Sequence, residues 1–427
     1  MRTLDLRVRP AAIEDVVRPR PATDPDVDRV VAGILAGVRE GGDAALLRYA
    51  RRFDSVDLSR RGLRVGSDEI TAALAAVPRE VRTALSVARK NIAAYHARQK
   101  QKSWTLKRVG VRLQQRYLPL NRVGIYVPGG KAAYPSTVLM NAIPASIAGV
   151  ADVVMVTPCS PDGFIRPEVL AAAHMCGIRE IYRIGGAQAI AALAYGTESI
   201  KAVDKITGPG NAYVASAKKQ VFGTVGIDMI AGPTEVVIVA EGNANPVYIA
   251  ADMIAQAEHD ERASSILLTT DETLVGNVER ELVRQLGSAP RGAIARKALE
   301  AYGALVVVKS LADAAAIVDR IAPEHLEVLV RRPRAFVRKV RNAGAIFVGE
   351  WSTEALGDYI LGPNHTLPTQ STARFSSALG VQDFMRFSNV IEVSRKGFRS
   401  VAPYVEALAR AEGLAGHEAS VRLRREP

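Results

Sequence analysis

The sequence predicts an α/β protein with two incomplete Rossmann-like units, each built on a parallel sheet. Three observations predict this class. Short β-rich runs alternate with helical runs from residue 122 onward, and a second series of the same kind follows the first. Glycine-rich turns close several of these runs, as they do where a parallel strand leads into its crossover helix. The chain has 427 residues, enough for two or three domains at roughly 150 residues each.

The stretch before residue 121 is expected to be mostly helical. Residues 24–53 and 67–100 carry apolar side chains at intervals of three and four residues, and the first of these stretches begins with acidic residues. "GVRLQQRYLPL" at 110–120 then alternates apolar and polar residues, which is typical of β structure. This segment separates the helical part from the alternating part.

The two strand series lie at regular intervals along the rest of the chain. Strands of the first series are expected within 123–130, 151–158, 180–186 and 202–210, and those of the second within 263–271, 303–310, 324–330 and 344–349. Helical runs separate them. After about residue 380 we expect an irregular tail that becomes helical.

Net charge and hydropathy limit the classes of partner that the protein can have. A net charge of +12 allows either a nucleic-acid or anionic-membrane surface or many solvated arginines. The densest basic run, 331–341, places Phe336, Val337 and Val340 at helical spacing and has no aromatic platform, so we expect a surface helix and no nucleic-acid partner. No apolar run of 18 residues and no signal-like start occur, which predicts a cytoplasmic protein with no membrane partner.

Three glycine turns in the first series follow strands and lead into helices. They are "YVPGGK" at 126–131, "IGGAQA" at 184–189 and "TGPGNAY" at 207–213. Free backbone N–H groups at a helix N-terminus bind anions such as phosphates. None of the turns is a GxGxxG fingerprint. They are therefore either tight βα turns alone or one ligand crevice that holds a dinucleotide in a non-standard way.

The histidines are the more discriminating signal. The chain has six, and four of them, His259, His325, His365 and His417, lie beside acidic or amide residues, which favours one convergent site over scattered surface histidines. Gln256 stands three residues before His259 and would share its helix face. A mixed set of nitrogen and oxygen ligands suits Zn²⁺. The two cysteines match no metal or disulfide pattern and are expected to be inert.

"PEHLE" at 323–327 places a carboxylate next to an imidazole. Histidine is well suited to proton transfer near neutral pH, and a partly buried glutamate activates water. Glu324 and His325 would then serve different steps. An exposed acid beside a packed histidine explains this stretch equally well when it is taken alone.

Several stretches are similar, and in the same order, to motifs of the histidinol dehydrogenase family. They are "VGIYVPGG", "GGAQAIAALAYGT", "VDKITGPGN", "AGPTEV", "AQAEHD", "PEHLE", "GAIFVG", "LGDY", "GPNHTLPT" and "ARFSS". The resemblance covers the chain from about residue 20 to the tail. It implies a zinc-dependent enzyme that oxidises L-histidinol through L-histidinal to L-histidine with two NAD⁺. It also implies an intertwined homodimer whose active sites take residues from both subunits.

The resemblance also implies roles for residues, one position at a time. The zinc ligands would be Gln256, His259, Asp358 and, from the tail of the partner chain, His417. The catalytic pair would be Glu324 and His325. Substrate contacts would come from Thr234, His365 and Glu412, with His325 and the four metal ligands. NAD contacts would come from Tyr126, Gln188 and Asn211, which fall on the three glycine turns.

With this resemblance the domain organisation is expected to have four parts. Residues 1–20 form an N-terminal segment, and residues 122–235 form a Rossmann-like NAD-binding domain. Residues 21–121 with 236–379 form a discontinuous Rossmann-like domain that carries the catalytic and metal residues. Residues 380–427 form a C-terminal tail that reaches the partner's active site.

Two details concern the substrate. Thr234 stands where much of the family has serine, and both residues keep a hydroxyl. "NHTLPT" and "AGPT" also resemble related zinc- and NAD-dependent dehydrogenases of other small alcohols, such as sulfopropanediol. Glu412 and His417 in "EGLAGHE" fit the histidinol enzymes well, so histidinol is the expected substrate and another small alcohol is the alternative.

Overall fold

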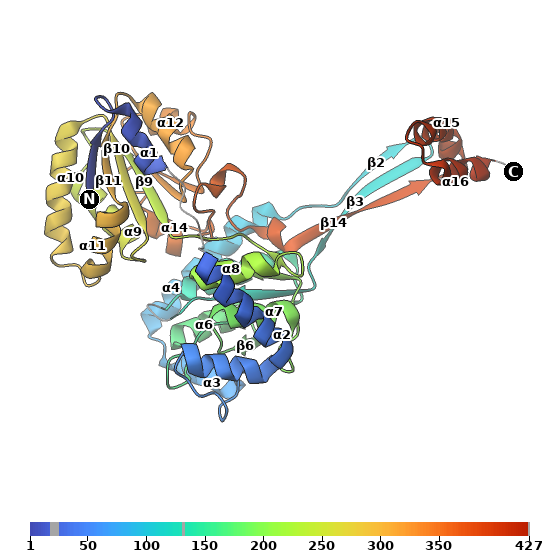
Figure 1. The fold of residues 1–427 in the computed structure, drawn as a ribbon, viewed down its shortest axis with the longest axis horizontal. Coiled ribbons are helices and arrows are strands. Elements are labelled where there is room, and N and C mark those ends of the chain that lie inside the picture. The colour runs from blue at the N-terminus through green and yellow to red at the C-terminus, as the bar shows by residue number, and fades with distance from the viewer. Residues whose placement is uncertain (18–24, 130–132, 426–427) are drawn as a thin grey trace.

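The computed structural model describes residues 1–17, 25–129 and 133–425. Two α/β bodies lie side by side, and a long arm with the C-terminus at its far end extends away from them (Figure 1). The expected fold class is confirmed, since both bodies are built on parallel sheets. None of the helices in the described ranges combines the length and the apolar character needed to cross a membrane.

The first body contains a five-stranded parallel sheet in the order β6-β5-β4-β7-β8. Counted along the chain, this is the order 3-2-1-4-5 of doubly wound folds, with its switch point between β4 and β7. Its strands and connecting helices are β4 (Arg122–Tyr126), α5 (Pro135–Ala148), β5 (Asp152–Val156), α6 (Pro167–Met175), β6 (Glu180–Tyr182), α7 (Gly186–Tyr195), β7 (Lys205–Thr207), α8 (Ala212–Val221) and β8 (Gly226–Ile227).

Three earlier helices cover the same sheet: α2 (Pro25–Phe53), α3 (Ser67–Ala76) and α4 (Arg79–His96). Leu46 of α2 packs in one core with Val154 of β5, and Ile92 of α4 packs in the other with Val123 of β4. The expectation that residues 21–121 belong with 236–379 is therefore wrong for these helices. Helical periodicity shows that a helix has an apolar face, but it does not show which sheet receives that face.

The second body contains a six-stranded parallel sheet in the order β1-β11-β10-β9-β12-β13. Its elements are β1 (Arg2–Asp5), α1 (Glu14–Val17), β9 (Glu235–Ala240), α9 (Pro246–Ala257), β10 (Ser264–Thr269), α10 (Glu272–Leu286), α11 (Gly292–Tyr302), β11 (Ala304–Val307), α12 (Leu311–Ile321), β12 (His325–Leu329), α13 (Pro333–Val337), β13 (Ala345–Val348) and α14 (Glu354–Tyr359). The beginning of the expected N-terminal segment is thus an edge strand of this sheet. The central strand β9 was not among the predicted strands.

The arm is a three-stranded antiparallel ribbon capped by two helices (Figure 1). Its elements are β2 (Trp104–Arg108), β3 (Val111–Pro119), β14 (Met385–Val393), α15 (Arg395–Ala411) and α16 (Ala415–Arg425). β14 pairs with β3 along its whole length, so the expectation of an irregular tail after residue 380 is wrong at this strand. The hydrogen-bond partner of β14 lies far away in the sequence, where local patterning gives no sign of it.

Candidate active site

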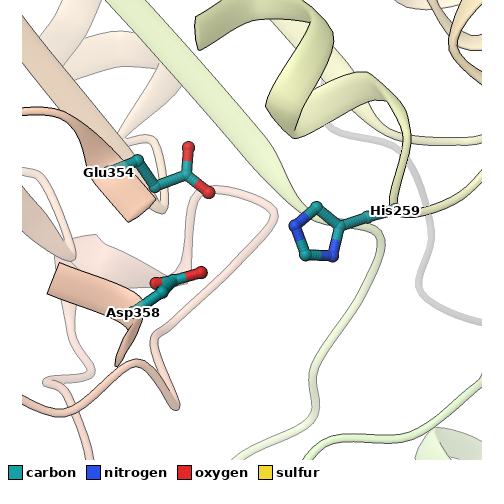
Figure 2. A group of neighbouring side chains, drawn as sticks. All are labelled: His259, Glu354 and Asp358. Atoms are coloured by element: carbon teal, nitrogen blue, oxygen red, sulfur yellow. The ribbon is translucent and has the colours of Figure 1, made fainter. Parts of the chain in front are cut away.

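Three side chains converge at one edge of the six-stranded sheet: His259, Glu354 and Asp358 (Figure 2). One nitrogen or oxygen of each lies within 4.8 Å of one such atom of the others. Glu354 and Asp358 stand four residues apart on α14, so both carboxylates project from one helix face. Across the gap, the His259 ring faces them from the loop that follows α9 (Figure 2).

Helix α9 holds Gln256 beside this group. Asn245 caps the helix through its side-chain oxygen, which accepts from the Val247 N–H at 3.0 Å, and Pro246 occupies the first turn. Gln256 is fully buried near the other end of the helix. His259 lies two residues beyond the last helical residue, Ala257, so the two side chains do not share a regular helix face as expected. They still meet because the backbone stays close to helical through Glu258.

The side chains around the Gln256 amide form a donor set that suits a cation. With the side-chain oxygen on the side of Glu354, the nitrogen donates to Thr234 Oγ1 at 2.6 Å, but the oxygen then faces carboxylate acceptors. Without a cation, the reversed amide fits better, with its nitrogen 2.7 Å from Glu354 Oε2. An amide oxygen, two carboxylates and an imidazole around one point form a donor set for Zn²⁺. The residues present therefore fit the metal that the resemblance implies.

Glu324 immediately precedes strand β12 and His325 is its first residue. Both therefore lie beside the amino end of the neighbouring strand β9. Glu324 Oε2 accepts from the Thr234 hydroxyl at 2.5 Å and from the Glu235 N–H at 3.0 Å. His325 Nδ1 is 3.1 Å from Gln256 Oε1 and 3.8 Å from Glu324 Oε2. His325 Nε2 is buried, makes no hydrogen bond within the described structure and lies 3.9 Å from Asp358 Oδ1. This ring nitrogen has no hydrogen-bond partner among the described residues and lies beside the candidate metal ligand Asp358, so it is available to a substrate.

Burial sets the protonation of these groups. It lowers the pKa of His325 to about 4 and also lowers the pKa of His259, so both rings are neutral at neutral pH. It raises the pKa of Glu324 to about 8, although the hydrogen bonds from Thr234 and Glu235 oppose the rise. Burial, followed by the charge of Asp358, raises the pKa of Glu354 well above the usual range. The site thus holds neutral imidazole bases and a glutamate that titrates near neutrality.

His365 connects this group to the first body. Its Nδ1 is 2.9 Å from the Asp358 carbonyl oxygen, and its Nε2 is 3.3 Å from the hydroxyl of Thr137 on α5. The neighbouring Asn364 donates to the Met140 carbonyl, also on α5, at 2.6 Å. The candidate catalytic group therefore lies where the two bodies meet, and not within one of them.

A cavity of about 740 Å³ opens in the first body. Tyr126, Gln188 and Asn211, the expected NAD contacts, all line it, so the structure brings the described parts of the three glycine turns together. Gly130 and Lys131 of the first turn lie outside the described residues. This is the carboxyl edge of the parallel strands, where open α/β sheets bind ligands. The Tyr126 hydroxyl accepts from the Gly186 N–H at 3.1 Å, and the Asn211 side chain accepts from the Tyr213 N–H at 3.1 Å.

A buried ion pair holds the third glycine turn. Lys218 and Asp228 form a direct salt bridge with side chains 2% and 1% exposed. Asp228 accepts from the Gly208 N–H at 2.8 Å, and Lys218 Nζ donates to the Gly208 carbonyl at 3.0 Å. Gly208 has φ of +113°, and a Cβ there would lie 2.1 Å from the Tyr126 carbonyl oxygen. The pair therefore fixes the turn directly against Tyr126.

The two tail residues stand apart from the others. Glu412 follows the last residue of α15 and His417 lies on α16, and both residues are exposed. These two helices form the far end of the arm (Figure 1). Within one chain the structure does not bring them to Gln256, His259 and Asp358. Glu354, in contrast, belongs to the group and was not predicted. Its spacing of four from Asp358 in "EALGD" was the available signal.

Two doubly wound bodies, a cavity at the glycine turns and a cation-binding group with a buried base define a metal-assisted, dinucleotide-dependent dehydrogenase. Comparison with known proteins agrees. Residues 18–425 match the sequence profile of the family described as histidinol dehydrogenase. Histidinol dehydrogenase from Syntrophotalea carbinolica is 54% identical over 407 residues, covering 95% of this chain and 94% of that protein.

The corresponding enzyme of Aquifex aeolicus is 50% identical over 400 residues, covering 94% of this chain and 93% of that protein. The crystal structure of histidinol dehydrogenase from Elizabethkingia anophelis superposes with a TM-score of 0.93 at 37% identity, covering 100% of this chain and 98% of that one. The chain belongs to the histidinol dehydrogenase family. The expected class of enzyme, an NAD-dependent oxidoreductase of histidine biosynthesis that uses zinc, is thereby confirmed.

Proposed function

We propose that the protein oxidises L-histidinol through L-histidinal to L-histidine with two NAD⁺, at the junction of its two bodies. One observation carries this: His259, Glu354 and Asp358 present ligand atoms within 4.8 Å of one another, next to the buried Glu324–His325 pair. Gln256, His259 and Asp358, with the partner's copy of His417, would hold zinc. When bound, zinc would supply a positive charge that orients the imidazole and amine of the substrate.

His325 is the proposed base for both oxidations. Its neutral ring has an unpaired, buried Nε2 near the metal group, so it would take the proton of the substrate alcohol. NAD⁺ supplies the hydride acceptor. His365 would contact the substrate from the side of α5, because its ring lies between Asp358 and Thr137.

Glu324 is the proposed base for the water that attacks the aldehyde. It shares the Thr234 hydroxyl with the Gln256 amide, so Thr234 would position both the base and a metal ligand. A carboxyl with a pKa near 8 both gives up and takes back a proton near neutral pH. Threonine at this position keeps the hydroxyl that these contacts need.

Tyr126, Gln188 and Asn211 are the proposed NAD contacts. They line one cavity, and the ligand would also meet α2 there, since Ile34 and Phe53 line the same space. We therefore assign NAD binding to residues 122–235 together with α2, and the metal and catalytic residues mainly to 236–379. This assignment agrees with the expected roles of the two bodies and differs in where the early helices belong.

The proposed assembly is a homodimer with shared active sites. Val401, Tyr404, Val405 and Leu408 form one apolar stripe on α15, and Tyr404 is 71% exposed. Such a stripe at the end of an arm suits a second copy of the chain. Residues 380–427 would then bring Glu412 and His417 to the partner's Gln256 and Asp358. The place of the reaction in biosynthesis favours the cytoplasm.

One assay tests the activity. NADH formed from L-histidinol should equal two per L-histidine produced, and a strong zinc chelator should abolish the reaction. The same assay with sulfopropanediol as substrate tests the alternative, that the protein is a related dehydrogenase of another small alcohol. Absence of histidinol turnover, or turnover that a chelator and removal of the metal leave unchanged, would contradict the proposal.

A further inference from the structure

Asp54 is an acidic residue in the proposed NAD cavity to which neither the resemblance nor the mechanism assigns a role. It follows Phe53, the last residue of α2, and both residues line the cavity with Tyr126 and Gln188. In the described part of the chain, no hydrogen bond or ion pair holds its carboxylate. Burial raises its pKa. Burial also raises the pKa of Tyr126 and Cys159, and the charge of Asp54 adds to both increases.

This position is unfavourable for a carboxylate in the unliganded protein. The C-terminal end of a helix carries partial negative charge, which repels an anion. The following residue, Ser55, has φ of +54°, a conformation that residues with a side chain adopt only at a cost. Asp57, three residues on, shows the ordinary alternative. It accepts from Ser59 and Arg51, which lower its pKa to about 2.

The missing partners of Asp54 would come from a ligand that offers hydrogen-bond donors. Residues of β4 alternate between the two faces of the sheet: Tyr126 packs in the core with α2, and Ile125 packs in the core with α5. The reacting end of NAD must reach the group at His365, which contacts α5. The opposite end, the adenosine, then points to α2. There Val30, Ile34 and Phe53 provide apolar surface for the base.

We propose that Asp54 accepts a hydrogen bond from the hydroxyls of the adenosine ribose and so selects NAD⁺ over NADP⁺. A carboxylate at this place binds the 2′-hydroxyl of NAD⁺ and repels the 2′-phosphate of NADP⁺. In standard dinucleotide folds this acid follows a strand of the sheet. Here it comes from the end of a helix that precedes the sheet, in keeping with the absence of the GxGxxG pattern. The inference rests on the proposed assignment of the cavity to NAD.

The test compares Asp54→Asn with Asp57→Asn, which removes a neighbouring carboxylate that is exposed. The kcat and KM for NAD⁺ and for NADP⁺ are measured with saturating histidinol. For Asp54→Asn we expect KM for NAD⁺ to rise about tenfold, kcat to stay within about twofold, and the preference for NAD⁺ over NADP⁺ to fall at least about tenfold. Asp57→Asn should leave that preference unchanged.

Two further measurements separate this role from a structural one. The thermal midpoint of Asp54→Asn should equal or exceed that of the parent, because an unfavourable charge is removed; a lower midpoint with an unchanged cofactor preference would overturn the proposal. On the parent enzyme, adenosine 5′-monophosphate should compete with NAD⁺ at least about tenfold better than adenosine 2′,5′-bisphosphate. Equal competition would overturn the proposal without any variant.

Gln188→Ala distinguishes failure of the inference from failure of the cavity assignment. If Gln188→Ala raises KM for NAD⁺ while Asp54→Asn changes neither KM nor preference, the cavity binds NAD and the role of Asp54 is wrong. If neither variant affects NAD⁺, the cavity assignment itself is wrong and the role of Asp54 is wrong with it.

Discussion

Glu354 and Asp358 stand one turn apart on the short helix α14 and direct both carboxylates at the His259 ring (Figure 2). The Gln256 amide also lies within hydrogen-bond distance of the Glu354 carboxyl group. Glu354 is therefore placed either to bind the metal or to orient Gln256. Each role makes zinc retention depend on its carboxyl group.

We expect Glu354→Gln to bind zinc about tenfold to one-hundredfold more weakly, because outer partners of metal ligands contribute that much to affinity. Zinc retained after dialysis against graded chelator is the measurement. Glu350→Gln, at an exposed position shortly before α14, is the matched control. Retention equal to that of the parent would remove Glu354 from the metal site.

In the pH profile of the second oxidation, the rise in rate from low pH should reflect deprotonation of Glu324. Burial raises its pKa to about 8, so the carboxyl is protonated below that pH and becomes a base above it. With L-histidinal as substrate, kcat should rise with pH through about 8. Glu324→Gln should lower this rate by at least about one-hundredfold and abolish that rise. If kcat of the glutamine variant still rises with pH through about 8, the titrating group is not Glu324.

The same shift makes folding stability depend on pH. The folded pKa is raised above the unfolded one, so the contribution of Glu324 is fully present below about pH 4.5 and is lost as pH rises through about 8. Glu324→Gln should therefore unfold at a higher temperature than the parent at pH 9, and this difference should shrink toward pH 5. A difference that does not vary with pH would contradict the shift.

Lys218 and Asp228 should act on NAD affinity through the Gly208 turn. Lys218→Met leaves Asp228 buried and unpaired, which we expect to lower the free energy of unfolding by about 3 kcal/mol. The double variant Lys218→Met/Asp228→Asn should regain part of that stability but keep a raised KM for NAD⁺, with KM for histidinol unchanged. Lys219→Met, at the exposed neighbour, is the control. Recovery of NAD affinity together with stability would show that the pair has no positioning role.

Shared active sites can be tested by mixing inactive chains. His259→Ala and His417→Ala should each be inactive as homodimers, because each removes a proposed zinc ligand. If the tail serves the partner, a mixed dimer has one site with both substitutions and one with neither, so activity should reappear up to about one quarter of the parent value after statistical exchange. Absence of recovery, with exchange verified by mass, would place both histidines in the site of one chain.

The sequence by itself determined the class of fold, the alternation of strands and helices from residue 122, and the three glycine turns that line one cavity. These features depend on local periodicity and on turn chemistry, which neighbouring residues carry. The motifs also led to the family. The domain assignment of α2 to α4 and the strands β1, β9 and β14 were missed, because they depend on which distant surface pairs with them.

Only the tertiary structure decided how the site is composed. It brought Glu354 beside His259, set Thr234 between Glu324 and Gln256, and placed the bridging His365 against the other body. It also left Glu412 at the end of α15 and His417 on α16, and these helices lie at the far end of the arm, away from the expected partners in the same chain. Hydrogen bonds across long sequence separations and the burial that shifts the pKa values of Glu324 and His325 exist only after both sheets have formed, so no local pattern encodes them.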